Sequence, residues 1–163
     1  MLKYALPILY RTSPPLVFKL LRRRMNEIIP LNRLLGIEMT AVGDGVAEAR
    51  LPFRSEVTNH IGTVHASAIF GLGEAASGGA MSGSFAPDIT TLRAVAAGAD
   101  ISFLKIARTD LVALAKVDGK SEALRERLRA EGKVVFDVLV DVRDANDLVI
   151  SSMTFSWHVS RKT

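Results

Sequence analysis

The chain contains no cysteine among its 163 residues. A disulfide framework and thiolate chemistry are therefore excluded, and a reducing, cytoplasmic compartment fits this composition. The three histidines are not accompanied by clustered acids, so the sequence offers no spacing typical of metal ligands. We expect a protein with neither a metal nor a resident cofactor.

Aromatic residues are also scarce, at 6% of the chain. The formal net charge of +4 is compatible with nucleic acid, anionic lipid or a phosphate-bearing ligand, and charge alone favours none of them. Basic strands studded with aromatics and recognition-helix patterns are both missing, which argues against a nucleic-acid partner.

Long apolar runs are absent as well. The segment MLKYALPILY is interrupted by Pro7 and is shorter than the roughly 18 residues that span a bilayer. It carries no small-residue cleavage motif, so we expect no transmembrane segment or leader but a packed or partner-facing part of a soluble protein. Because Arg22, Arg23 and Arg24 follow, a loose peripheral membrane contact is the alternative, while a solvated helix face is the commoner origin of such a run.

The residues that are present suit one α+β domain, with 48% apolar and 23% charged residues. Ser13 before Pro14 predicts a helix start with a hydroxyl N-cap, and Pro30 predicts its end. Strand-like runs at 36–42 and 46–53 flank Gly43-Asp44-Gly45, which indicates a hairpin.

The remainder of the chain predicts a central helix over 65–82 and then a strand-rich half. Strands are expected at 93–106, 111–117, 134–142 and at the end of the chain, where apolar residues recur at every second position. The segment 120–132 predicts a short helix ended by Gly132. The order of elements is typical of an α+β fold.

The central helix carries a single carboxylate, Glu74, among small uncharged residues. At about 100° per residue, Ser67 and Phe70 lie on its side, whereas Ile69 and Leu72 lie opposite and are expected to pack on a sheet. An acid on an otherwise apolar helix costs stability unless it has a partner or a task, so Glu74 is the first candidate for chemistry.

His65 precedes Glu74 by nine positions, which is half a turn around the helix. At 1.5 Å per residue the two lie up to about 13 Å apart along the axis, so their side chains do not readily meet within one helix. If both serve one site, a second subunit has to bring them together. The spacing therefore implies a homodimer on that condition.

The pattern Asn59-x-x-Gly62-Thr63-x-His65, followed by this acid, resembles the hotdog-fold thioesterases. It is similar to the phenylacetate-pathway and 4-hydroxybenzoyl-CoA type, whose loop reads N-x-x-G-x-x-H-G-G. The segment DISFLKIARTDLVALAKV resembles their third and fourth strands, and the order of elements from 33 to 160 matches.

The resemblance implies an antiparallel sheet wrapped around a long central helix, in dimers with a site at the interface; a tetramer is left open. Residues 33–163 would form this hotdog domain, and 1–32 an N-terminal helical extension. The implied substrate is an acyl-CoA thioester, with coenzyme A entering only as part of the substrate.

The resemblance also implies roles for the site residues. Glu74 would be the nucleophile or the base that activates water, with Asn59 and His65 as further catalytic residues. The Ala66 backbone N–H would bind the oxyanion. Gly62, Ser67 and Phe70 complete the predicted substrate-binding set.

Three departures keep an alternative open. His65-Ala66-Ser67 replaces His-Gly-Gly, the third strand lacks an early serine or threonine, and residues 120–132 replace a short connection. The inserted segment is either a solvated helix or a nucleotide contact through Arg125, Arg127 or Arg129. The alternative function is a non-catalytic acyl-CoA or lipid-binding hotdog protein.

Overall fold

The computed structural model describes residues 2–162, with side chains from Ala5 onward. The helices are α1 Leu2–Thr12, α2 Pro14–Ile28, α3 Pro30–Leu35, α4 Ala66–Ser84 and α5 Ser121–Glu131. The strands are β1 Glu38–Gly43, β2 Val46–Leu51, β3 Leu92–Phe103, β4 Leu111–Val117, β5 Lys133–Asp144 and β6 Val149–Arg161. Short 3₁₀ turns occupy Ser55–Val57 and Ile89–Thr91.

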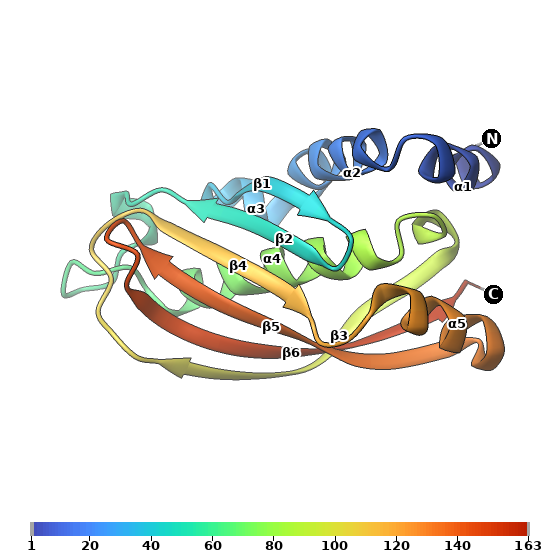
Figure 1. The fold of residues 1–163 in the computed structure, drawn as a ribbon. Helices are drawn as coiled ribbons and strands as arrows, with labels where there is room; N and C mark the ends of the chain where they lie inside the picture. Colours follow the sequence, from blue (N-terminus) through green and yellow to red (C-terminus); the bar gives the residue numbers. More distant parts are fainter. Residues whose placement is uncertain (1, 163) are drawn as a thin grey trace.

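The six strands form one antiparallel sheet in the order β1-β2-β4-β5-β6-β3. The sheet curves along α4, and both termini lie at one end of the molecule (Figure 1). The predicted hairpin is confirmed, since Gly43 pairs with Val46 and Gly45 adopts the left-handed φ of +73° that such a turn requires. The α+β prediction is confirmed too.

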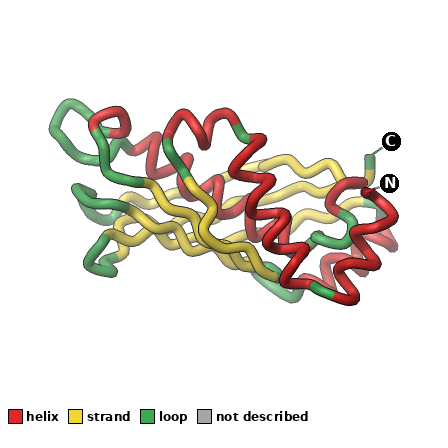
Figure 2. Tube along the Cα trace, turned by 90° about the horizontal axis from the view of Figure 1, so that it is seen from above, coloured by secondary structure: helices red, strands yellow, loops and turns green. Residues whose placement is uncertain are grey.

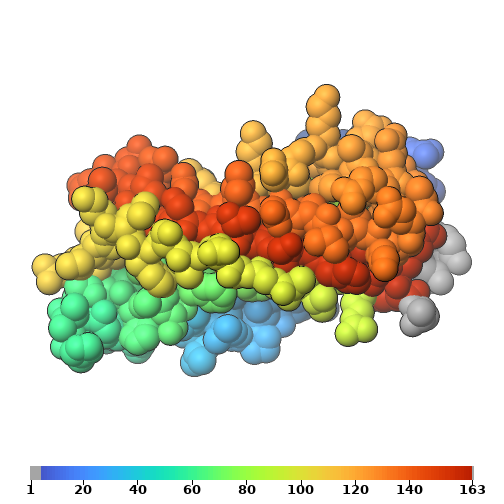
Figure 3. All heavy atoms as spheres, turned by 90° about the horizontal axis from the view of Figure 1, so that it is seen from below, coloured from blue at the N-terminus to red at the C-terminus, as the bar shows by residue number. Residues whose placement is uncertain are grey.

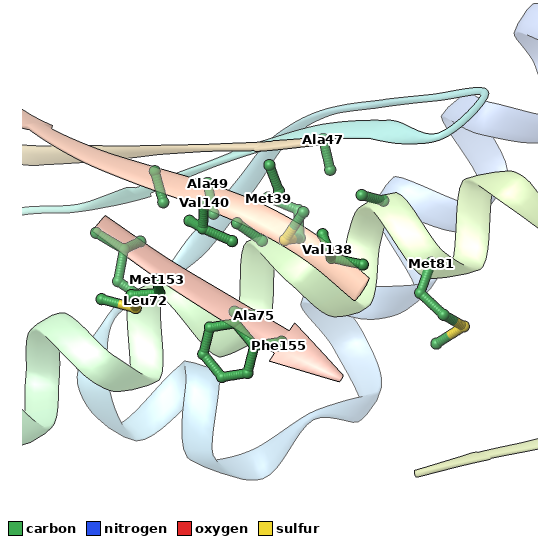
Figure 4. Packing of buried hydrophobic residues seen from close by; sticks show 14 of the residues in the cluster. Met39, Ala47, Ala49, Leu72, Ala75, Met81, Val138, Val140, Met153 and Phe155 are labelled. Atoms are coloured by element: carbon green, nitrogen blue, oxygen red, sulfur yellow. The ribbon is translucent and has the colours of Figure 1, made fainter. Parts of the chain in front are cut away.

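The core lies between α4 and the sheet. Ile69, Leu72 and Ala76 are buried, as their place opposite Glu74 predicts. Figure 4 shows the side chains of Met39, Ala47 and Val138 filling the space between the helix and the strands. The alternating apolar positions of β5 and β6 point into this core, which explains why their periodicity identified them as strands.

The N-terminal region contains more helix than the sequence predicts. α2 begins at Pro14, but the Ser13 hydroxyl makes no capping bond, so that part of the prediction is wrong. Ser13 directly follows the last residue of α1, and its N–H donates to the Leu9 carbonyl. This bond to α1 ties Ser13 to the end of the preceding helix. A separate helix, α3, begins at Pro30, and Gly36, with a φ of +73°, caps its C-terminal end.

Strand β3 forms one edge of the sheet and bonds only to β6 within residues 2–162. Most of its side chains are exposed, and a bulge between Ala96 and Gly98 interrupts the alternation of its faces. Figure 3 shows β3 as an open band of atoms along the surface seen from below. The backbone groups on its outer side are therefore free to pair with another strand.

None of the helices within residues 2–162 has both the length and the apolar character needed to cross a membrane.

Candidate active site

The loop that leads into α4 is organised by Asn59. Its Oδ1 accepts hydrogen bonds from the N–H groups of Ile61 and Thr63, both at 3.1 Å, and its Nδ2 donates to Thr63 Oγ1 at 2.8 Å. The Gly62 N–H donates to the Asn59 carbonyl, and Gly62 has a φ of +71°. In the protomer, Asn59 and Gly62 thus act as a turn that fixes the position of His65.

His65 is the N-cap of α4. Its Nδ1 accepts a hydrogen bond from the Ser67 N–H at 3.0 Å, which satisfies one of the free donors of the first turn. Because Nδ1 is the acceptor, the neutral ring carries its proton on Nε2, which remains available as a donor. The Ala66 N–H has no acceptor within the described chain and stays exposed at the positive end of the helix.

Glu74 is partly buried in the middle of α4. Its carboxylate has no hydrogen-bond or ion-pair partner among the described residues, and burial raises its pKa above the ordinary value of 4.5. Loss of water disfavours the charged form, so the carboxylate is a stronger base than one in water. This is the property that a general base near neutral pH needs.

Around Glu74, the surface of α4 carries an apolar ring, and the helix backbone is held to the sheet. Phe70 lies one turn earlier and is 36% exposed, while its ring packs on Phe155 at a centroid distance of 5.3 Å. One turn later, the Ser77 hydroxyl donates to the Glu74 carbonyl at 2.8 Å and accepts from Trp157 Nε1 at 3.2 Å. The backbone that carries the acid is thereby tied to β6.

A second loop, between β3 and β4, lies beside the first. The Ala107 carbonyl accepts a hydrogen bond from the Val64 N–H at 2.9 Å, so the two loops are joined next to the start of α4. Leu104 and Ile106 are 52% and 67% exposed in this loop. The loops lie together at the end of the molecule opposite the termini (Figure 2).

The structure therefore gathers most of the predicted residues at one end of α4, but Phe70 and Glu74 lie further along the helix. Asn59, Gly62, His65, Ala66 and Ser67 cluster at the loop and the first turn, while Glu74 lies more than two turns further along. No hydrogen bond joins His65 to Glu74 within residues 2–162. The catalytic and binding roles assigned to these residues stay predictions.

Two parts of this arrangement were missed by the sequence reasoning. The Val64–Ala107 and Ser77–Trp157 bonds join residues that lie far apart in the chain, and nothing in a single sequence pairs them. Leu104 and Ile106 were the one sequence signal that the segment after the third strand takes part in the site. A segment that faces only solvent has no reason to carry two large apolar residues so close together.

The basic residues of the inserted helix lie elsewhere. Arg125 donates to the Ser84 carbonyl at 2.6 Å, at the C-terminal end of α4, and pairs with Asp44 at 3.3 Å. It is a structural residue within the protomer. Among the described residues, no three His, Cys, Asp or Glu side chains are grouped so that they could hold a metal ion.

Residues 18–159 match the family described as a domain of unknown function, DUF4442. The chain belongs to the DUF4442 family. Among curated proteins, no sequence matches this DUF4442 chain.

Solved structures show which fold the DUF4442 chain has. A Pseudomonas aeruginosa protein of unknown function, named "Probable Thioesterase", superposes with a TM-score of 0.76 at 22% identity, over 88% of this chain and 95% of that one. A Haemophilus influenzae thioesterase gives 0.70 at 17% identity, over 86% and 90%.

The phenylacetic acid degradation protein PaaI of Thermus thermophilus, in a mutant form, gives a TM-score of 0.64 at 16% identity, over 80% of this chain and 98% of that one. The hotdog fold predicted for the DUF4442 chain is thereby confirmed.

Proposed function

We propose that this protein is a thioesterase that hydrolyses acyl-CoA at a site around Glu74, completed by a second copy of the chain. The observation that carries the proposal is a partly buried carboxylate with a raised pKa and no partner among the described residues. It stands on a helix whose first turn presents an unoccupied N–H at Ala66. The fold shared with named thioesterases supports the same reaction class.

The chemistry follows from these groups. Glu74 takes a proton from water, the water oxygen attacks the thioester carbon, and the carbonyl electrons move to oxygen. An N–H at a helix start stabilises that oxyanion, and the His65 Nε2–H is a second donor on the same loop. The C–S bond then breaks and the thiolate recovers the proton from Glu74. Direct attack by Glu74, through an anhydride that water hydrolyses, uses the same groups.

The spacing along α4 supports a second copy. The donors at the start of α4 and the carboxylate in its middle are more than two turns apart on different sides of one helix. The open edge of β3 supports a homodimer in which two sheets join edge to edge, since an exposed twelve-residue edge strand otherwise invites uncontrolled pairing. A partner across this edge would face the side of α4 that carries Glu74.

The surroundings of the site support an acyl-CoA substrate. Phe70, Leu104 and Ile106 are exposed apolar side chains that an acyl group would cover. Lys105 and Arg108, exposed on the same loop, supply positive charge for the phosphates of coenzyme A.

The test is Glu74→Gln, assayed by thiol release from short, long and aromatic acyl-CoAs. We expect kcat/KM to fall by about 10²- to 10⁴-fold, the range ascribed to a positioned acid or base. Glu126→Gln, an exposed carboxylate on α5, is the matched control and is expected to keep full activity. Circular dichroism and the mass in solution should be unchanged in both variants.

Full activity in the Glu74→Gln variant would refute the mechanism. If the wild type binds acyl-CoA without releasing thiol, and Glu74→Ala binds equally well, the protein is a non-catalytic acyl-CoA-binding protein and the hydrolase proposal is wrong.

A further inference from the structure

The net positive charge of this protein comes from its N-terminal region. Residues 1–37 contain seven Lys and Arg and one acid, Glu27, for a net charge of +6. Residues 38–163 contain fourteen Lys and Arg and sixteen acids, for a net charge of −2. The overall charge of +4 is therefore a property of one region, and the rest of the molecule is weakly acidic.

The same helices expose large apolar side chains. Ile8 of α1 is 67% exposed, Leu16 and Leu20 of α2 are 43% and 47% exposed, and Leu31 and Leu34 of α3 are 55% and 74% exposed. Helices that had completed their packing would turn such residues inward. A patch of this kind on a folded protein marks a surface that something else covers.

On α2 the apolar and basic residues share one face. Val17 and Met25 are buried and Leu21 is partly buried, so these three side chains mark the inward face. At about 100° per residue, Leu16 and Arg23 lie on the opposite side, between Lys19 and Leu20.

Two of the three consecutive arginines of α2 make no contact that holds the helix to the rest of the described protein. Arg22 is the arginine that fastens α2 to the sheet, through the Thr40 carbonyl at 3.3 Å. Among the described residues, Arg23 and Arg24 form ion pairs only with Glu27, and both partners of each pair are exposed. Exposed pairs of this kind contribute little and exchange readily for other anions.

From this arrangement we infer that the surface of α1–α3 binds the face of an anionic lipid bilayer, lying on it without crossing it. Arginines and lysines beside leucines and isoleucines on short helices are the composition of interfacial helices, whose apolar residues enter the headgroup region while the basic ones meet lipid phosphates. The charge asymmetry favours this orientation, because the weakly acidic remainder is repelled by the same surface. α1 and α2 lie on the side of the molecule away from β3, so the free sheet edge is not used (Figure 1).

The other partners fit less well. Nucleic acid would meet the arginines, but exposed leucines and isoleucines find no contact on a phosphate backbone. A second copy of the chain would place two strongly basic surfaces against each other. The inference does not depend on the proposed hydrolase activity.

The test is flotation of the full chain with vesicles of phosphatidylcholine, with and without about 30% phosphatidylglycerol, at about 0.15 M salt. We expect binding only to the anionic vesicles. The variant Arg23→Gln/Arg24→Gln is expected to bind at least about tenfold more weakly. The control Arg127→Gln/Arg129→Gln removes the same charge from exposed positions of α5 and is expected to bind as the wild type does.

A second pair of variants tests the apolar contact. Leu16→Ser/Leu20→Ser should lose most of its binding, whereas Leu114→Ser, equally exposed on the outer face of the sheet, should keep it. The inference is wrong if the wild type ignores anionic vesicles, if both arginine variants weaken equally, or if the leucine variant binds normally. Binding to DNA in place of vesicles would identify nucleic acid as the partner and refute the inference. A smaller oligomer mass in the leucine variant, without any vesicle binding, would identify a second copy of the chain and refute it as well.

Discussion

The two halves of α4 differ in how completely they are engaged. The C-terminal half, from Ser77 to Ser84, is buried throughout, and the hydroxyls of Ser77 and Ser84 are paired within the protomer. The Ser84 hydroxyl accepts a hydrogen bond from Ser121 at 2.9 Å, and the Ser84 carbonyl accepts one from Arg125. The N-terminal half holds an exposed first turn and a carboxylate, that of Glu74, with no partner among the described residues. One end of the helix anchors it, and the other end is the candidate site.

Glycines make the anchored half possible. A Cβ at Gly79 would lie 2.8 Å from Ala47 Cβ, and one at Gly83 would overlap the backbone carbonyl of Gly43. At Gly83 the backbone of α4 therefore packs directly against the backbone of the β1–β2 hairpin, with no side chain between them. This close packing fixes the C-terminal half of α4 against the sheet.

The largest effect is expected for Gly83→Ala. The new methyl group collides with the Gly43 carbonyl, which belongs to a paired strand and cannot move independently, so we expect a loss of about 3 kcal/mol in the free energy of unfolding. Urea denaturation measures it.

Gly78→Ala is the control on the same helix, because its Cβ would meet Trp157 at an ordinary 3.6 Å. This change should be neutral or gain about 0.5–1 kcal/mol from helix propensity. Equal destabilisation by both alanines would mean that the close approach of α4 is not the cause.

A smaller effect is expected at the open end. His65→Ala removes the acceptor for the Ser67 N–H and should lower the free energy of unfolding by about 1 kcal/mol. His65→Asn replaces one good N-cap with another and should restore most of that stability. If His65 also polarises the substrate carbonyl, thiol release stays low in the asparagine variant, which separates the two roles.

The smallest effect concerns the charge on Glu74. Burial raises the pKa of this carboxyl above 4.5 in the folded state, so the unfolded chain releases the proton at a lower pH than the folded one. As the pH rises through this window, the wild type loses stability relative to Glu74→Gln. Thermal unfolding should show the glutamine variant as the more stable at pH above this window, with no difference well below pH 4.5.

Glu126→Gln, at an exposed position of α5, is the control in the same measurement. A Glu74→Gln variant that is less stable than the wild type at neutral pH would indicate a partner for the carboxylate, contributed by a second subunit.

Much of the fold could be predicted because its signals are local. β4 occupies 111–117 as predicted, and α4 differs by one or two residues at each end, since alternation and small-residue periodicity reflect which side chains meet the core. α1 and α3 escaped prediction because tertiary contacts stabilise them: α1 contains Pro7 and is held by Leu6, which packs with Val17 and Ala86.

The site was only partly predictable, for a related reason. Glu74 stood out because a lone acid on an apolar helix is anomalous within its own neighbourhood. The hydrogen bonds between Asn59 and Thr63 also join nearby residues, but the sequence does not reveal that both the oxygen and the nitrogen of the Asn59 amide bond within their own loop. Contacts between distant segments, and any contribution from a partner, leave no local trace.

The hydrogen bond at the start of α4 assigns different roles to the two ring nitrogens of His65. A ring that accepts from the Ser67 amide can take up a second proton only at Nδ1, where two donors would then oppose each other. A donor at Nδ1 would leave the Ser67 N–H without its acceptor, while the N–H groups of Ala68 and Ile69 would keep theirs, the His65 carbonyl. Nδ1 of His65 is thus occupied by the helix, and Nε2 is the ring nitrogen that faces outward with a hydrogen to donate.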